Sequence, residues 1–165
     1  MKLSVREAFA SYSYHKEYAL EFTSDMFDGF PNDAVTDKVN AAVVISSESG
    51  VVTCDITVSA VFKTVCSRCL KEFSLPFETN SKKLVRRDQT EDFEDVIYAD
   101  SSLAVDIVEE IRTLIYFEFP AKPLCSEDCK GLCPVCGCDL NTDCCSCDIR
   151  TVDPRLAVLK KLIDK

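Results

Sequence analysis

Residues 51–77 read VVTCDITVSAVFKTVCSRCLKEFSLPF, and this stretch decides the fold. Within Val52–Phe62 the apolar side chains alternate with mostly polar ones, which is the period-two pattern of a strand with one buried face. The alternation resumes in Phe73–Phe77, after the motif C-S-R-C. Two strands that flank four residues indicate a β-hairpin, so we expect Cys66–Cys69 to form its turn.

The residues on either side extend this β-rich pattern. Lys38–Ile45 is rich in Val and Ala, and the E-S-G sequence at Glu48–Gly50 is a turn signal. Pro76 has no backbone N–H to donate, which favours an edge position for the second strand of the hairpin. Cys54 lies on the apolar side of the first strand, so we expect it in the core. Nearer the N-terminus, Gly29–Asn32 reads as a loop.

A helix is expected over residues 102–118, with Ser101 or Ser102 as the N-cap. Its apolar residues recur at helical spacing, at Leu103, Ile107, Ile111, Leu114 and Ile115. Residues 88–101 are acidic and are predicted to form a loop. A final short helix is predicted to start at Asp153–Pro154, where an N-cap residue is followed by proline.

These patterns predict an α+β fold in two parts. Residues 1–120 are expected to form a mainly antiparallel β domain with a packed helix. Residues 121–165 are expected to form a small cysteine-rich, zinc-binding C-terminal module with the terminal helix. A chain of 165 residues is long enough to bury a core, so metal need not be its only source of stability.

Composition excludes several classes of protein. The chain has 19 basic and 28 acidic residues, a net charge of −9, which argues against nonspecific coating of nucleic acid. Nearly all of this charge lies in residues 91–120, with 9 acidic residues and 1 basic residue. The single histidine, His15, is expected at the surface. Without a base-plus-nucleophile pair or a Gly-rich phosphate loop, we expect no enzymatic activity and no small-molecule substrate.

No stretch resembles a signal peptide or approaches the roughly 18 uncharged apolar residues of a membrane span, so we expect a cytoplasmic protein without membrane contact. The chain has 11 cysteines, an odd number, so complete disulfide pairing within one chain is impossible. In a reducing compartment, cysteines indicate metal ligands or redox thiols before disulfides.

Residues 125–147 hold eight of the cysteines. The C-P-V-C-G sequence at Cys133–Gly137 has the spacing of a zinc knuckle, and Cys145 with Cys147 offers a second close pair. Thiolates favour zinc over magnesium or calcium, and an iron–sulfur cluster is the main alternative. Cys138 and Cys144 look supernumerary, because each lies beside a better-placed ligand.

The pair Cys66 and Cys69 has three interpretations. It can ligate a metal, form a redox dithiol or be a hairpin turn with two inert thiols.

Four basic residues form a local patch in an otherwise neutral region, which is either a solvated strand face or an RNA-contacting spot that binds phosphate. They are Lys82, Lys83, Arg86 and Arg87.

The order of the motifs resembles the YceD-like family of large ribosomal RNA subunit accumulation proteins. The motifs are C-x-R-C-L at Cys66–Leu70, C-x3-C-x-G-L-C-P-x-C-G-x-x-L-N at Cys125–Asn141, C-x-C at Cys145–Cys147, and D-P-R-L-x-x-L at Asp153–Leu159. The resemblance implies a non-catalytic ribosome-biogenesis factor for large-subunit (23S) rRNA. Its partner would be rRNA or a basic ribosomal protein. A zinc-dependent protein-interaction module without RNA contact, and a thiol oxidoreductase using Cys66 and Cys69, remain as alternatives.

Eight cysteines fit the family pattern, which is enough for two sets of four. The first hypothesis gives one zinc to Cys133, Cys136, Cys145 and Cys147. If the C-terminal module docks on the hairpin tip, a second zinc would bind Cys66, Cys69, Cys125 and Cys129. Whether the chain holds one zinc or two stays open at this point.

Overall fold

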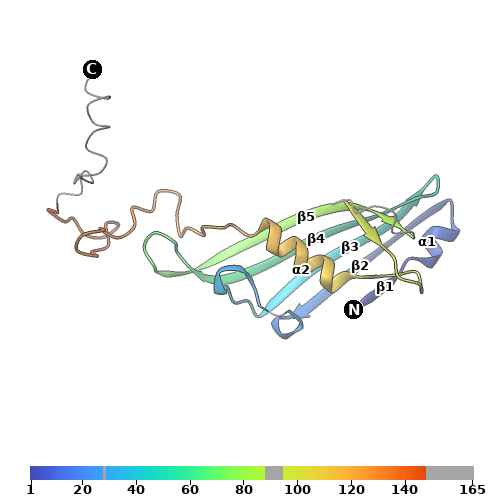
Figure 1. The fold of residues 1–165 in the computed structure, drawn as a ribbon, viewed down its shortest axis with the longest axis horizontal. Helices are drawn as coiled ribbons and strands as arrows, with labels where there is room; N and C mark the ends of the chain where they lie inside the picture. Colours follow the sequence, from blue (N-terminus) through green and yellow to red (C-terminus); the bar gives the residue numbers. More distant parts are fainter. Residues whose placement is uncertain (28, 88–94, 148–165) are drawn as a thin grey trace, which may run out of the picture.

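The computed structural model describes residues 1–27, 29–87 and 95–147. Its main feature is a five-stranded sheet in the order β2-β3-β4-β5-β6 (Figure 1). The strands are β2 (Ser13–Thr23), β3 (Lys38–Glu48), β4 (Val51–Val65), β5 (Glu72–Arg86) and β6 (Val96–Tyr98). The first four pair antiparallel and β6 pairs parallel to β5, so the sheet is mainly antiparallel, as predicted.

The turns explain why the long strands meet in this register. Glu48 pairs with Val51, so Ser49 and Gly50 form a two-residue hairpin loop. Both have positive φ (51° and 82°), as the turn that matches the twist of paired strands requires. At the other end Val65 pairs with Glu72, so the C-S-R-C motif lies in the hairpin turn, as predicted.

Pro76 lies at an edge, as expected. It pairs with Val61 on one side, whereas β6 contacts β5 only at residues 84–86. The missing N–H of Pro76 therefore costs no hydrogen bond within the described sheet.

The smaller elements pack around this sheet. They are β1 (Lys2–Ser4), α1 (Arg6–Ala10), β7 (Ala104–Asp106), α2 (Ile107–Glu118) and the 3-10 turns Ser24–Met26 and Pro31–Asp33. Helix α2 crosses one face of the sheet (Figure 1). Its buried residues Ile107, Ile111 and Ile115 join the core, which also holds Cys54 as predicted. In that core Phe62 makes edge-to-face contacts with Phe30, Phe77 and Phe119 at 4.9–5.6 Å.

Two predictions about local structure were wrong. The helix starts at Ile107 rather than near residue 102, because Leu103 has a positive φ (56°) and residues 104–106 pair with β1. The segment predicted as a loop over residues 88–101 contains β6, whose Ile97 is buried. The final helix predicted from Asp153–Pro154 lies outside the described residues.

The corrected helix start gives a testable prediction. Asp106 is the N-cap, and its carboxylate accepts a hydrogen bond from the Val108 N–H at 3.2 Å. We expect Asp106→Ala to lower the free energy of unfolding by about 1 kcal/mol, measured by urea denaturation. The matched control is Ser101→Ala, which removes a side chain predicted as the cap. An equal loss from Ser101→Ala would contradict the assignment.

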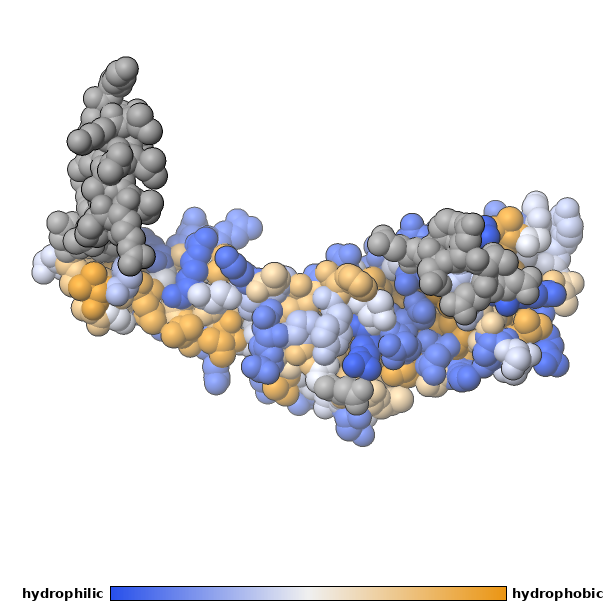
Figure 2. Space-filling view, in the orientation of Figure 1, coloured by the Kyte–Doolittle hydropathy of each residue, from blue (hydrophilic) through white to orange (hydrophobic). Residues whose placement is uncertain are grey.

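None of the helices in the described part of the chain is long and apolar enough to cross a membrane. The hairpin of β4 and β5 extends beyond the body of the sheet toward the cysteine-rich end (Figure 1). At that end the surface shows a concentration of hydrophobic residues, whereas the rest of the surface in this view is more mixed (Figure 2).

Candidate metal centre

The structure brings the predicted cysteines together as two groups of four. The first thiol group is Cys66, Cys69, Cys125 and Cys129; the second thiol group is Cys133, Cys136, Cys145 and Cys147. Within each group all sulfurs lie within 4.8 Å of one another. In the first group the Sγ atoms of Cys66 and Cys129 are 3.8 Å apart, and those of Cys69 and Cys125 are 3.6 Å apart.

These distances fit a single tetrahedral ion. Four thiolates each about 2.3 Å from one zinc ion lie about 3.8 Å from one another. The separations are far longer than a disulfide bond of about 2.05 Å, and all 11 cysteines are free thiols. Both groups therefore have the donor atoms and the spacing that a tetrahedral metal ion requires.

The first thiol group joins segments that are distant in the sequence. Cys66 and Cys69 come from the β4–β5 turn, and Cys125 and Cys129 follow α2. Cys66, Cys69 and Cys129 are buried, with Leu124 and Phe73 packed against them. The C-terminal module thus contacts the hairpin tip. The sequence predicted a zinc ion at these four cysteines only on that condition.

Arg68 supplies the contacts that hold this junction. Its guanidinium donates hydrogen bonds to the carbonyl oxygens of Cys129 (2.8 Å) and Glu127 (3.2 Å). Its own carbonyl accepts one from the Leu132 N–H at 3.1 Å. Gly131 packs so closely that a Cβ there would lie 3.0 Å from the Arg68 oxygen. The C-S-R-C motif therefore positions the module through its arginine as well as its thiols.

The second thiol group is built locally. The Gly137 N–H donates to the Cys133 carbonyl at 2.8 Å, and Gly137 has the positive φ (75°) that this turn requires. The Val135 N–H donates to the Cys133 sulfur at 3.4 Å. A backbone N–H that faces a cysteine sulfur in a C-x-x-C turn is consistent with the zinc knuckle that the spacing predicted.

Two polar residues from the segment that carries the second thiol group contact the first thiol group or the hairpin. The sequence analysis assigned them no role. Asn141 donates from its amide nitrogen to the Cys129 sulfur (3.5 Å) and accepts from the Lys130 N–H (2.8 Å). Asp139 forms an ion pair with Lys71 of the hairpin at 2.5 Å. The sequence signal for Asn141 was its place at the L-N end of the long cysteine motif.

Asn141 gives a second prediction. We expect Asn141→Ala to weaken metal binding at the first thiol group about tenfold, because partners that hydrogen-bond to a ligand orient it. Chelator competition with purified protein measures this affinity. The control is Thr142→Ala, a neighbouring exposed side chain without a bond to sulfur. Unchanged affinity in Asn141→Ala would contradict the role.

One thiol in each group ionises readily. Burial of the Cys66 thiol opposes ionisation, but backbone N–H groups, first that of Cys125, outweigh it and lower its pKa to about 6. Backbone N–H groups, first that of Cys136, lower the pKa of Cys133 to about 6. Each group therefore offers a thiolate, the form that binds metal, at neutral pH.

Other thiols in the groups resist ionisation. The neighbouring Cys69 thiol raises the pKa of Cys125 to about 12, and Cys136 does the same for Cys147. Several thiolates so close together repel one another, whereas a divalent cation stabilises them all. The electrostatics of both groups therefore favour a bound cation.

The remaining cysteines lie outside the two groups. Burial raises the pKa of the core thiol Cys54 to about 12. The half-buried Cys138 lies beside the second thiol group, its carbonyl accepts from the Cys133 N–H, and the adjacent Cys136 raises its pKa to about 12. Cys144 is exposed. Both were predicted to be supernumerary.

The four residues predicted as a basic patch do not share one surface, which corrects that interpretation; they are Lys82, Lys83, Arg86 and Arg87. Neighbours on a strand point to opposite faces. Lys82 lies 3.3 Å from Asp55 on one face, and Lys83 lies 2.9 Å from Glu110 of α2 on the other. Arg87 stacks over an aromatic ring of α1 at 4.3 Å.

The single histidine, His15, is exposed, as expected.

Comparison with known proteins adds a family match. The model of a family described as "Large ribosomal RNA subunit accumulation protein YceD" matches residues 54–163. That stretch includes both thiol groups.

Two curated proteins are similar to this chain. One is "Uncharacterized protein YlbN" from Bacillus subtilis (strain 168), 34% identical over 111 residues, which are 66% of this chain and 64% of that protein. The other is "Large ribosomal RNA subunit accumulation protein YCED homolog 1, chloroplastic" from Zea mays. It is 37% identical over 67 residues, 39% of this chain and 23% of its own length. The chain thus covers less than two thirds of either relative. No solved structure matches.

Proposed function

This chain belongs to the YceD family of large ribosomal RNA subunit accumulation proteins, and we propose on that basis that it is a non-catalytic ribosome-biogenesis factor. It supports the accumulation or processing of 23S rRNA, in the cytoplasm. The observation that carries the proposal is the family match across both thiol groups. The name of the maize relative also refers to accumulation of the large ribosomal RNA subunit.

Zinc is the metal that we assign to both groups. Four thiolates at tetrahedral spacing suit it, and it needs no open coordination position in a structural site. An iron–sulfur cluster places several iron atoms and sulfides between its thiolates, so it holds them farther apart than one ion does. Sulfur separations of 3.6–3.8 Å in the first thiol group support the single ion.

The zinc ions would serve structure rather than chemistry. Four cysteines in each group would fill all four positions of a tetrahedral ion and would leave none for water or substrate. The alternative of a thiol oxidoreductase requires an accessible dithiol, whereas Cys66 is 0% exposed and Cys69 is 4% exposed. Burial of both sulfurs supports the ligand role over the redox role.

The partner is rRNA or a basic ribosomal protein. Support for a basic protein comes from the acidic stretch of sequence over residues 95–118, which includes Asp95, Glu109 and Glu118. Opposite charge on two proteins accelerates their encounter.

Ultraviolet crosslinking in bacterial cells tests this function. The tagged chain replaces the host's own family member, and its crosslinks are read for both RNA and protein while 23S rRNA is quantified. We expect ribosomal crosslinks and normal 23S rRNA, and a reduced 23S rRNA level when the first thiol group is replaced by serine. Normal 23S rRNA in cells without any family member would refute the function. Protein crosslinks without any ribosomal component would instead favour a zinc-dependent interaction module.

A further inference from the structure

We propose that a groove across the open face of the sheet, opposite α2, binds an extended lysine- or arginine-rich segment of a partner protein. This inference rests on the proposed function and chooses between its two kinds of partner. The open face consists of the outward-pointing side chains of β2–β5, which are largely exposed.

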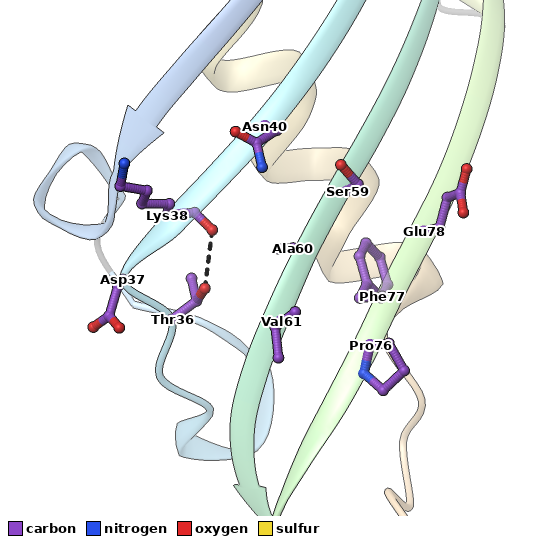
Figure 3. A pocket seen from close by; sticks show the side chains of 10 residues that line it. All are labelled: Thr36, Asp37, Lys38, Asn40, Ser59, Ala60, Val61, Pro76, Phe77 and Glu78. Carbon is purple, nitrogen blue, oxygen red and sulfur yellow. Dashed lines mark hydrogen bonds between the residues drawn. The ribbon is translucent and has the colours of Figure 1, made fainter.

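The groove has two continuous parts. One part, about 670 Å³, lies over β3, β4 and β5 (Figure 3). The other, about 380 Å³, continues over β2, β3 and β4. Asn40, Ser59 and Glu78 line both parts. The groove therefore runs across the strands from β5 to the edge strand β2.

Small side chains form much of the surface between the strands. Ala19, Ala42, Thr57 and Ser59 are all exposed in the smaller part. Next to them, Val61 and Pro76 add exposed apolar surface at the end nearest the hairpin tip. Where these small side chains lie, another backbone can approach closely, which suits an extended peptide.

The charges of the groove favour a cationic occupant. Asp37 lies at one side of the groove and Glu78 at the other (Figure 3), and neither has a hydrogen bond or ion pair among the described residues. The cation in the groove, Lys38, lies 2.7 Å from Glu21 and is neutralised by it. Lysine or arginine side chains of a peptide would pair with Asp37 and Glu78.

The same groove lacks what RNA needs. Unpaired carboxylates repel phosphate, and nonspecific RNA affinity depends on lysine and arginine at the phosphates. Proteins that bind single strands on a sheet stack bases on exposed aromatic rings. The aromatic residue that lines this groove is Phe77, which is buried against Phe62 and Phe119. Between the two partners, the groove fits the basic protein.

Fluorescence anisotropy with the zinc-loaded full chain tests the inference. The probe is a labelled peptide of four Lys-Ala-Val repeats, with a Glu-Ala-Val peptide and a single-stranded RNA of similar length as comparisons. The variants are Glu78→Lys, Asp37→Lys and Ser59→Trp, the last of which fills the groove without changing charge. Glu48→Lys is the matched control, because Glu48 is exposed on the same face but does not line the groove. Circular dichroism verifies that each variant folds.

We expect the lysine peptide to bind. Each charge reversal in the groove should lower its affinity about fivefold more than Glu48→Lys does. Ser59→Trp should also weaken it, and the glutamate peptide should not bind. Equal binding by Glu78→Lys and Glu48→Lys would overturn the inference, as would RNA binding that Ser59→Trp abolishes. A failure is separable from failure of the proposed function: Glu78→Lys cells with normal 23S rRNA would reject the groove while the family role stands.

Discussion

Purified under reducing conditions, the protein is expected to contain two zinc ions per chain, and the Cys66→Ser/Cys69→Ser variant only one. The variant leaves two thiols in the first thiol group, too few to hold an ion tightly, and does not touch the second group. Structural zinc contributes about 10–16 kcal/mol of binding free energy in small modules, so the cysteine-rich end should lose order where an ion is lost. Metal analysis by mass spectrometry gives the stoichiometry.

The control for this experiment is Cys138→Ser/Cys144→Ser. Both thiols lie outside the two groups, so this double variant should retain two ions. If the protein holds one ion per chain and the Cys66→Ser/Cys69→Ser variant still holds one, the first thiol group does not bind metal. Absence of bound metal under reducing conditions would remove both.

Gly131→Ala is expected to weaken metal binding at the first thiol group about a hundredfold and to leave the second ion in place. Gly131 has φ of 76°, where an alanine costs about 1–2 kcal/mol. In addition, the new Cβ would lie 3.0 Å from the Arg68 carbonyl oxygen and 3.2 Å from its Cβ. At these distances the loop or the hairpin must shift by a few tenths of an ångström, which weakens the neighbouring Leu132–Arg68 hydrogen bond, worth about 1 kcal/mol.

Gly137→Ala separates the collision from the backbone strain. Gly137 has nearly the same φ, 75°, but an added Cβ there would meet nothing within 4 Å. This variant should bear only the strain and should leave the first thiol group intact. Chelator-induced release, followed at both ions, distinguishes the cases. Retention of the first ion in Gly131→Ala would show that the loop can move without opening the site.

The sequence predicted those parts of the fold that have a long local signal. Strand β4 alternates over 15 residues, and the C-S-R-C motif between two such strands placed the hairpin turn correctly. Strands β1, β6 and β7 have three residues each, too few to show a period. The pairing of Lys2 with Asp106 depends on tertiary contacts that no local pattern encodes. The start of the helix was predicted wrongly for the same reason, because residues 104–106 pair with β1.

The candidate site divides in the same way. The spacing of Cys133 and Cys136 is a local signal, whereas the first thiol group required a docking that the sequence left conditional. The separation of Lys82 from Lys83 was available in principle, because the strand period of two places neighbours on opposite faces. By that rule Lys82 and Lys83 belong to two faces of the sheet and not to one patch.

The way in which the two thiol groups span the chain has a consequence for the order of assembly. The second group lies within residues 133–147, so its ligands meet by short-range diffusion. Cys66 and Cys129 of the first group are 63 residues apart, and closing so long a segment has a larger entropic cost. During synthesis the hairpin leaves the ribosome well before Cys129 does. Until Cys125 and Cys129 follow, Cys66 and Cys69 are exposed thiols of the nascent chain, so the junction forms only after the segment that follows α2 has been synthesised.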